Sequence, residues 1–234
     1  LTLPENDRVC LMAVTMANDP GVGTFPAQPL LDELVRDEVR AQVMRPIAAS
    51  GWNRDIIVER TASPPYTSFA ASFDVPNQYA YYERGLGSSA KGLPQDRAFI
   101  SVSDGVTEGL LQPYSGPNVL FLNGDNPSGT LVFAPVSRTR YRSLAVFAAS
   151  ANAPQDSTGT MTIMFTDGSS SAPLPYNAYD WFFATANNAV YDLGRVRLSS
   201  SGFEDGSDGN PRIYQTTIDL EVLGLHSQDI YSLT

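Results

Sequence analysis

One short segment holds most of the side chains that could recognise a small polar ligand. Residues 176–181 read Tyr-Asn-Ala-Tyr-Asp-Trp, which places three aromatic rings beside an amide and a carboxylate. Sugars present apolar C–H faces together with hydroxyl groups, and aromatic rings flanked by Asp and Asn side chains complement both. Pro173 and Pro175 precede the segment and restrict its backbone, which lowers the entropy lost when a preformed site binds. The segment therefore predicts a sugar-recognising loop.

Within this prediction, Trp181 and Tyr179 stack on a sugar ring, while Asp180 and the asparagines form hydrogen bonds with hydroxyl groups. The candidate carbohydrate-binding residues are Tyr176, Asn177, Tyr179, Asp180 and Trp181, with Asn123 from a separate turn. The same letters also permit a structural interpretation, in which Trp181–Phe182–Phe183 is a hydrophobic plug and Asp180 fixes a turn. Both interpretations stay open at this stage.

Three turns rich in Asp, Asn and Gly could bind a hard cation: residues 51–55, 123–126 and 204–210. Calcium takes about six to eight oxygen ligands from carboxylates, amides and backbone carbonyls, and such turns supply these groups. The candidate ligands of a structural calcium ion are Asn53, Asp55, Asp205 and Asp208. The alternative is that Asp, Asn and Gly simply form turns here.

Several other chemistries are excluded by residue counts. Cys10 is the single cysteine and His226 the single histidine, so neither a thiolate metal site, nor a multi-histidine site, nor an intrachain disulfide is possible. The chain has 15 Lys and Arg residues against 25 Asp and Glu, a formal net charge of -10, which opposes binding to nucleic acid or anionic membranes. No apolar run is long enough to span a membrane.

The elements that position these residues are mostly strands. Residues 8–17 predict one strand, and residues 28–44 predict an amphipathic helix that ends before Pro46. The apolar residues of this helix are Leu30, Leu31, Leu34, Val35, Val39 and Val43. After residue 46, short β-rich runs alternate with Gly, Pro, Asn, Asp and Ser clusters, and residues 160–166 alternate up to the turn pair Asp167–Gly168. This pattern predicts an all-β sandwich rather than a βαβ fold. Phe69, Phe121, Phe133, Phe147 and Phe165 are the predicted core phenylalanines.

The stretch from about Arg45 to Thr234 resembles the galactose-binding-like jelly-roll modules of secreted bacterial polysaccharide-degrading or surface proteins. The resemblance is carried by SGWNRDIIVE (50–59), LQPYSGPNVLFL (111–122), residues 128–152, GTMTIMFTDGSS (159–170), YNAYDWF (176–182) and NPRIYQTTIDLEVLGL (210–225). It implies a jelly-roll β-sandwich over 45–234 that binds polysaccharide or oligosaccharide without catalysis and accompanies other domains of one parent chain. Residues 1–44 fall outside the resemblance and are expected to be a strand and helical linker, the tail of a preceding domain.

Two other functions remain open. The first is a β-jelly-roll polysaccharide lyase or glycoside hydrolase, in which Arg138, Arg140 and Arg142 would neutralise a uronate carboxylate. The scarcity of basic groups suited to proton transfer, with one His and one Lys, weighs against this enzyme. The second is a structural or adhesive domain of a surface protein.

Overall fold

The computed structural model describes residues 8–18, 44–75, 77–154, 156–182, 186–200, 202–204 and 209–234. The described chain is mostly β, and its helices, all shorter than seven residues, are single 3-10 turns. These turns are η1 (Tyr66–Ser68), η2 (Leu86–Ser88) and η3 (Pro135–Ser137). The prediction of an all-β fold after residue 46 is therefore confirmed for the described residues. The helix predicted over 28–44 lies outside them, apart from Met44.

The larger sheet is built around two long strands, β1 (Arg8–Asn18) and β10 (Tyr141–Ser150), which pair antiparallel along most of their lengths. Its order is β14 (Asn188–Val190), β17 (Ile213–Asp219), β10, β1 and β2 (Arg45–Pro46), and β8 (Leu120–Asn123) also pairs with β1. The expected domain boundary at residue 44 separates β1 from strands with which it shares a sheet. Residues 8–18 therefore belong to the sandwich and not to a preceding domain.

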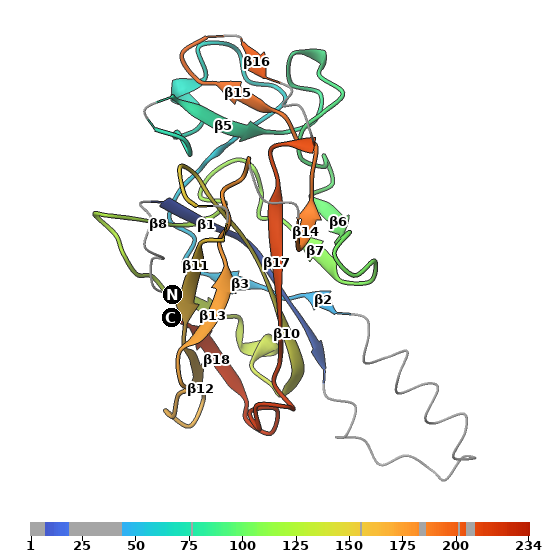
Figure 1. Cartoon of the computed structure of the whole chain (residues 1–234), viewed down its shortest axis with the longest axis vertical. Helices are drawn as coiled ribbons and strands as arrows, with labels where there is room; N and C mark the ends of the chain where they lie inside the picture. Colours follow the sequence, from blue (N-terminus) through green and yellow to red (C-terminus); the bar gives the residue numbers. More distant parts are fainter. Residues whose placement is uncertain are drawn as a thin grey trace, which may run out of the picture.

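A second layer faces this sheet (Figure 1). It contains β12 (Ile163–Phe165), β18 (Ile230–Leu233), β9 (Leu131–Phe133) and β3 (Ala49–Ser50), with β11 (Thr158–Met161) and β13 (Leu174–Asn177) paired beside them. Only Thr162 separates β11 from β12, and its backbone exchanges hydrogen bonds of 2.7 and 2.9 Å with that of Thr234. The two pieces thus continue one another across the layer.

The main core fills the space between the layers and explains the periodicity of the sequence. Leu144, Val146 and Ala148 of β10 point into it, whereas Phe147 and Ala149 pack in a second core on the opposite face of the sheet. Both faces of β10 are covered, which explains why its residues 144–149 are continuously apolar instead of alternating. Phe121, Phe133, Phe147 and Phe165 are buried as predicted, but Phe69 follows η1 at the surface and is 40% exposed, so that prediction is wrong.

A smaller lobe covers one end of the sandwich, at the top of Figure 1. It holds β4 (Ile57–Val58), β5 (Tyr79–Tyr82), β15 (Arg195–Arg197) and β16 (Phe203–Glu204) in one sheet. Alternation along β5 sends Tyr79 and Tyr81 towards the second core and Ala80 and Tyr82 into a third cluster inside the lobe. A separate hairpin of β6 (Ala98–Ile100) and β7 (Glu108–Leu110) packs against the large sheet. No helix in the described part of the chain is long and apolar enough to cross a membrane.

Candidate functional site

The predicted sugar-stacking residue Trp181 lies inside the molecule. Its residue is 2% exposed, and its ring centroid lies 4.9 Å from those of both Phe73 and Tyr81 in edge-on geometry. This packing supports the structural interpretation of the segment, in which Trp181 is part of a hydrophobic plug, and not the interpretation as a sugar platform. The indole offers no open face on which a sugar could stack.

Asp180 holds the Trp181 loop against the large sheet. Its carboxylate accepts backbone N–H groups from Ala153 at 3.0 Å and Phe182 at 2.9 Å, and its carbonyl accepts the hydroxyl of Tyr214 at 2.6 Å. The backbone around it continues the pairing of β10, because the Trp181 N–H donates to the Ser150 carbonyl at 2.9 Å. Burial raises the pKa of Asp180, although these hydrogen bonds oppose the shift. The Asp180 carboxylate therefore stabilises the loop that contains Trp181.

The other predicted sugar-binding residues are also engaged within the fold. Tyr176 is buried and covers Gly159 so closely that a Cβ there would lie 2.2 Å from the ring. Asn177 donates its Nδ2 to the Gln215 carbonyl at 3.1 Å, and Tyr179, half-buried, meets Tyr214 edge-on at 5.2 Å.

Asn123 does not join this group. Its Oδ1 accepts the N–H of Asn126 at 2.9 Å in the turn after β8, and β1 and β10 lie between that turn and Asp180. The sequence placed Asn123 in the sugar site, but the structure does not bring it there.

The predicted calcium ligands Asn53 and Asp55 face hydrogen-bond donors. The Asn53 side chain pairs with the backbone of Phe121 through bonds of 3.0 and 2.7 Å, as a neighbouring strand would. Asp55 accepts Asn118 Nδ2 at 2.7 Å and the N–H groups of Gly116 at 3.1 Å and Ile57 at 3.2 Å. Oxygens surrounded by N–H groups do not fit a cation site, so these two residues fix loops instead.

The remaining predicted ligands, Asp205 and Asp208, lie outside the described residues. Within the ranges that the structure describes, no group of three or more His, Cys, Asp or Glu side chains is arranged to hold a metal ion. The calcium prediction therefore rests on segment 204–210 alone.

The arginine triplet on and before β10 is distributed among separate partners. Arg140 lies 3.7 Å from Asp229, and Arg142 lies 2.6 Å from Glu221. Arg138 packs over the Tyr231 ring at 4.5 Å and donates to the Phe133 carbonyl at 3.0 Å. Neutralising a uronate carboxylate would require these guanidinium groups to converge on one point, and they do not.

A polar cluster that the sequence did not single out forms where the small lobe meets the sandwich. Strand register assembles its centre, because Arg197 pairs with Tyr79 and Arg195 pairs with Glu204. Residues two apart on a strand share a face, so Arg195 and Arg197 lie on the side opposite the buried Val196. We call this group the Arg195 cluster; its members are Asp74, Asn77, Tyr79, Asn152, Arg195, Arg197 and Glu204.

Arg195 stands at the middle of the cluster, above the aromatic rings around Trp181. Its guanidinium carbon lies 3.8 Å from the Tyr79 ring centroid and 4.1 Å from that of Phe182. It also pairs with two carboxylates, Glu204 at 2.7 Å and Asp74 at 3.4 Å. Its side chain is 17% exposed, so these contacts fix the guanidinium rather than leave it mobile.

Two asparagine side chains extend the cluster to the surface. The Asp74 carboxylate, itself buried, accepts Nδ2 groups from Asn152 at 3.0 Å and Asn77 at 3.2 Å. Both asparagines are exposed. Asn77 lies 3 positions from Asp74 in the chain, whereas Asn152 lies 78 positions from it. The buried carboxylate thus orients two solvent-facing amides.

On its other side the cluster ends in a hydrogen-bonded triad. The Tyr79 hydroxyl donates to Glu204 Oε1 and accepts from Arg197 Nη2, the latter at 2.5 Å. Burial, with the neighbouring Glu204 carboxylate, raises the pKa of Tyr79. The hydrogen bond from Tyr79, supported by Arg195, lowers the pKa of Glu204. The triad is therefore a neutral phenol between a carboxylate and a guanidinium.

Sequence signals for this cluster exist but are weak. The alternation in Arg195–Val196–Arg197 indicates a strand with two arginines on one face. Nothing in the sequence indicates that Asp74 and Asn152 lie beside them, because strand pairing and loop geometry bring these positions together. The chain matches no known family model, no curated protein and no solved structure.

Proposed function

We propose that this protein is a non-catalytic carbohydrate-binding module and that it holds sugar hydroxyl groups at the Arg195 cluster. The observation that carries the proposal is the arrangement of exposed amides, a guanidinium and a carboxylate around the fixed Arg195–Tyr79 stack. A sugar does not stack on Trp181 in this proposal, because that ring is buried.

The chemistry of the exposed members suits neutral hydroxyl groups. The Arg197 and Glu204 side chains are both 46% exposed, so one offers donors and the other acceptors at the surface. Asn77 and Asn152 add amides that both donate and accept. Because Asp74 and Arg195 already hold several of these groups in place, little side-chain entropy is lost on binding.

Tyr79 is the residue that bears on the alternative function, a polysaccharide lyase. A polysaccharide lyase needs a base together with a cation near the substrate carboxylate, and a tyrosine between Arg197 and Glu204 has the right groups. Tyr79 is only 3% exposed, however, and burial raises its pKa, which disfavours the phenolate. These two facts favour binding over catalysis.

The wider context of the module is also proposed here. A jelly-roll sandwich from a secreted bacterial protein, joined to other domains that act on polysaccharide, is the setting that the sequence resemblance implies. A structural calcium ion in segment 204–210 would stabilise the folded protein, and chelation would then lower its melting temperature.

The test is retention of the full chain on a panel of insoluble plant and algal polysaccharides, with a reducing-sugar assay on the same samples. We expect retention on at least one polysaccharide without release of reducing sugar. Asn152→Ala and Arg197→Ala should each reduce retention about tenfold, since a lost hydrogen bond to a charged or amide group costs roughly 1–2 kcal/mol.

Arg142→Ala is the matched control, because it removes an arginine whose side chain is also part of a surface ion pair. It should bind like the unmodified protein. Retention that both cluster variants leave unchanged would refute the Arg195 site, and absence of retention on every polysaccharide would favour a structural or adhesive domain. Release of reducing sugar would assign an enzyme.

A further inference from the structure

The outer face of the hairpin of β6 and β7 is apolar apart from one carboxylate. The inner face packs on the large sheet through Phe99. Strand pairing places Ala98 opposite Leu110 and Ile100 opposite Glu108, and these four residues share the outer face. The solvent side of an antiparallel pair is usually polar, so this combination of three apolar residues with a single charge is unusual.

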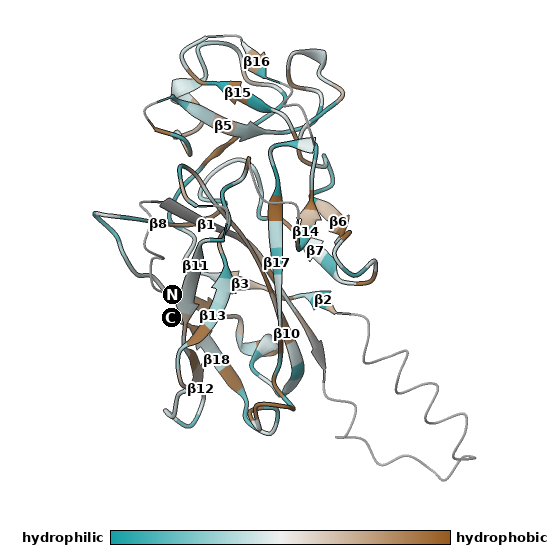
Figure 2. Cartoon of the chain, in the orientation of Figure 1, coloured by the Kyte–Doolittle hydropathy of each residue, from teal (hydrophilic) through white to brown (hydrophobic). Residues whose placement is uncertain are grey.

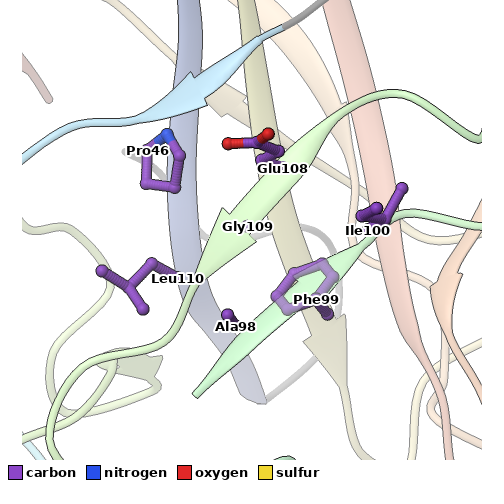
Figure 3. A pocket seen from close by; sticks show the side chains of 7 residues that line it. All are labelled: Pro46, Ala98, Phe99, Ile100, Glu108, Gly109 and Leu110. Carbon is purple, nitrogen blue, oxygen red and sulfur yellow. The ribbon is translucent and has the colours of Figure 1, made fainter. Parts of the chain in front are cut away.

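The outer face forms one side of an open hollow. Its volume is about 450 Å³, and Pro46 of β2 lies beside the hairpin residues that line it (Figure 3). Ile100 is 61% exposed and Leu110 is 40% exposed, and Figure 2 shows β6 as a hydrophobic (brown) strand at the side of the molecule. Sites for small molecules have volumes of about 300–1,000 Å³ and mostly apolar linings, so the hollow has the size and lining of such a site.

Glu108 gives the hollow a negative charge without a counter-charge. It is the one charged residue among those that line the hollow, and it is half-buried. Its backbone is fixed, because its N–H donates to the Met44 carbonyl at 2.9 Å. Its carboxylate, which lies between Pro46 and Ile100 in Figure 3, forms no hydrogen bond or ion pair with any residue that the structure describes. A cation bound in the hollow would therefore meet an unpaired carboxylate.

We propose that this hollow binds a small amphipathic cation, that is, an apolar or aromatic body that carries one protonated amine. The body covers Ile100 and Leu110 and removes their apolar surface from water, while the ammonium group pairs with Glu108. An anion of the same shape is repelled by Glu108, and the net charge of -10 opposes it further. The hollow shares no residue with the Arg195 cluster, so this site does not depend on carbohydrate binding.

Nuclear magnetic resonance of the ¹⁵N-labelled full chain tests the site with three probes of one shape: 3-phenylpropylammonium, 3-phenylpropanol and 3-phenylpropanoate. The ammonium should shift the amide signals of 98–100 and 108–110 saturably. Its dissociation constant should be about fivefold lower than that of the alcohol, as expected for one partly exposed ion pair. The carboxylate should bind more weakly than the alcohol.

Three variants separate the contribution of charge from that of the apolar surface. Glu108→Gln keeps the shape of the side chain and should make the ammonium and the alcohol bind alike. Asp125→Asn removes the same charge from an exposed turn outside the hollow and should leave the fivefold preference intact. Ile100→Ser should weaken the ammonium and the alcohol by the same factor, about three- to tenfold, because both lose the same apolar contact.

The amide signals of β10 and β17 should be the same in all three variants, which shows that each one is folded. The absence of saturable shifts with the ammonium, or shifts that lie outside the hairpin, would overturn the proposal. Equal binding of the ammonium and the alcohol to the unmodified protein would also overturn it, as would a preference for the ammonium that Glu108→Gln retains. Retention on polysaccharide is a separate measurement, so failure of one site leaves the other standing.

Discussion

The two ends of β10 carry similar residues in different settings. At one end Arg140 and Arg142 each pair with a single carboxylate, and their side chains are 49% and 36% exposed. At the other end, about 30 Å away along the strand, Asn152 belongs to the cluster in which Arg195 contacts two carboxylates and two aromatic rings.

The difference teaches what makes a group of charged residues a candidate site. Exposed ion pairs lose little solvation and fix little geometry, so they contribute about 0–1 kcal/mol and recognise nothing in particular. At the Arg195 end the guanidinium lies against the Tyr79 and Phe182 rings, with Trp181 farther away at 5.8 Å, and these contacts hold it in one place. Trp181 is in turn packed between Phe73 and Tyr81. Four predictions would break or sharpen this contrast.

Replacing the aromatic support should have the largest effect. Trp181→Ala removes a fully packed indole and should lower the free energy of unfolding by about 3–5 kcal/mol. Tyr231→Ala, which removes the more exposed ring beneath Arg138 at the other end, should cost about 1 kcal/mol or less. Urea unfolding monitored by circular dichroism measures both. Equal losses in the two variants would contradict the contrast.

Removing the buried carboxylate should come next. Asp74→Ala removes one partner of Arg195 and one acceptor from each of two asparagine amides, which should cost about 2–3 kcal/mol. Asp229→Ala, which removes the partner of Arg140, should stay within about 0.5 kcal/mol. The same unfolding measurement compares them, and a cost below that of Asp229→Ala would show that Asp74 does not organise the cluster.

The pH dependence of the Glu204 contribution should be smaller. Its pKa in the folded protein lies below its ordinary value of 4.5, so folding favours the carboxylate. The stabilisation is complete above pH 4.5 and is lost as the pH falls through the lowered pKa. Because the side chain is 46% exposed, the amount is only about 0.5 kcal/mol. Thermal unfolding of the unmodified protein and of Glu204→Gln should differ at pH 7, and the difference should vanish as the pH falls below the lowered pKa of Glu204. A difference that grows on acidification would reverse the assignment.

The smallest effect is expected at the exposed arginines. Arg142→Ala should change the free energy of unfolding by no more than about 0.5 kcal/mol, and 0.5 M NaCl should abolish even that difference because the pair is screened. A larger loss of unfolding free energy that salt does not abolish would mean that the side chains at this end of β10 are held as rigidly as those of the Arg195 cluster.

Much of the fold can be predicted from the periodicity of the sequence, whereas the Arg195 cluster cannot. The alternation through residues 160–166 and the turn at Asp167–Gly168 are both present, with Gly168 at φ +87°. Phe69 is predicted to lie in the core, but it follows the 3-10 turn Tyr66–Ser68 and is exposed. Local pattern detects which residues are apolar, whereas it does not show which face another element will cover.

The burial of Trp181 illustrates this limit. An indole beside Asp and Asn has the composition of a sugar platform, and composition is the same whether the ring faces water or the core. Its burial depends on Phe73 and Tyr81, about 100 positions earlier in the chain. The contacts of Asp74 with Asn152 and Arg195 are equally long-range, at 78 and 121 positions. Such contacts follow from strand pairing, which a single sequence does not specify.

The most direct test of the central claim is a hydrogen-exchange footprint of the full chain with and without a polysaccharide fragment that it retains. We predict slower exchange in peptides covering 74–82, 150–154 and 195–200 when the fragment is bound, with no change in peptides covering 136–144. Protection centred on 136–144, or an unchanged pattern throughout with bound fragment, would contradict carbohydrate binding at the Arg195 cluster.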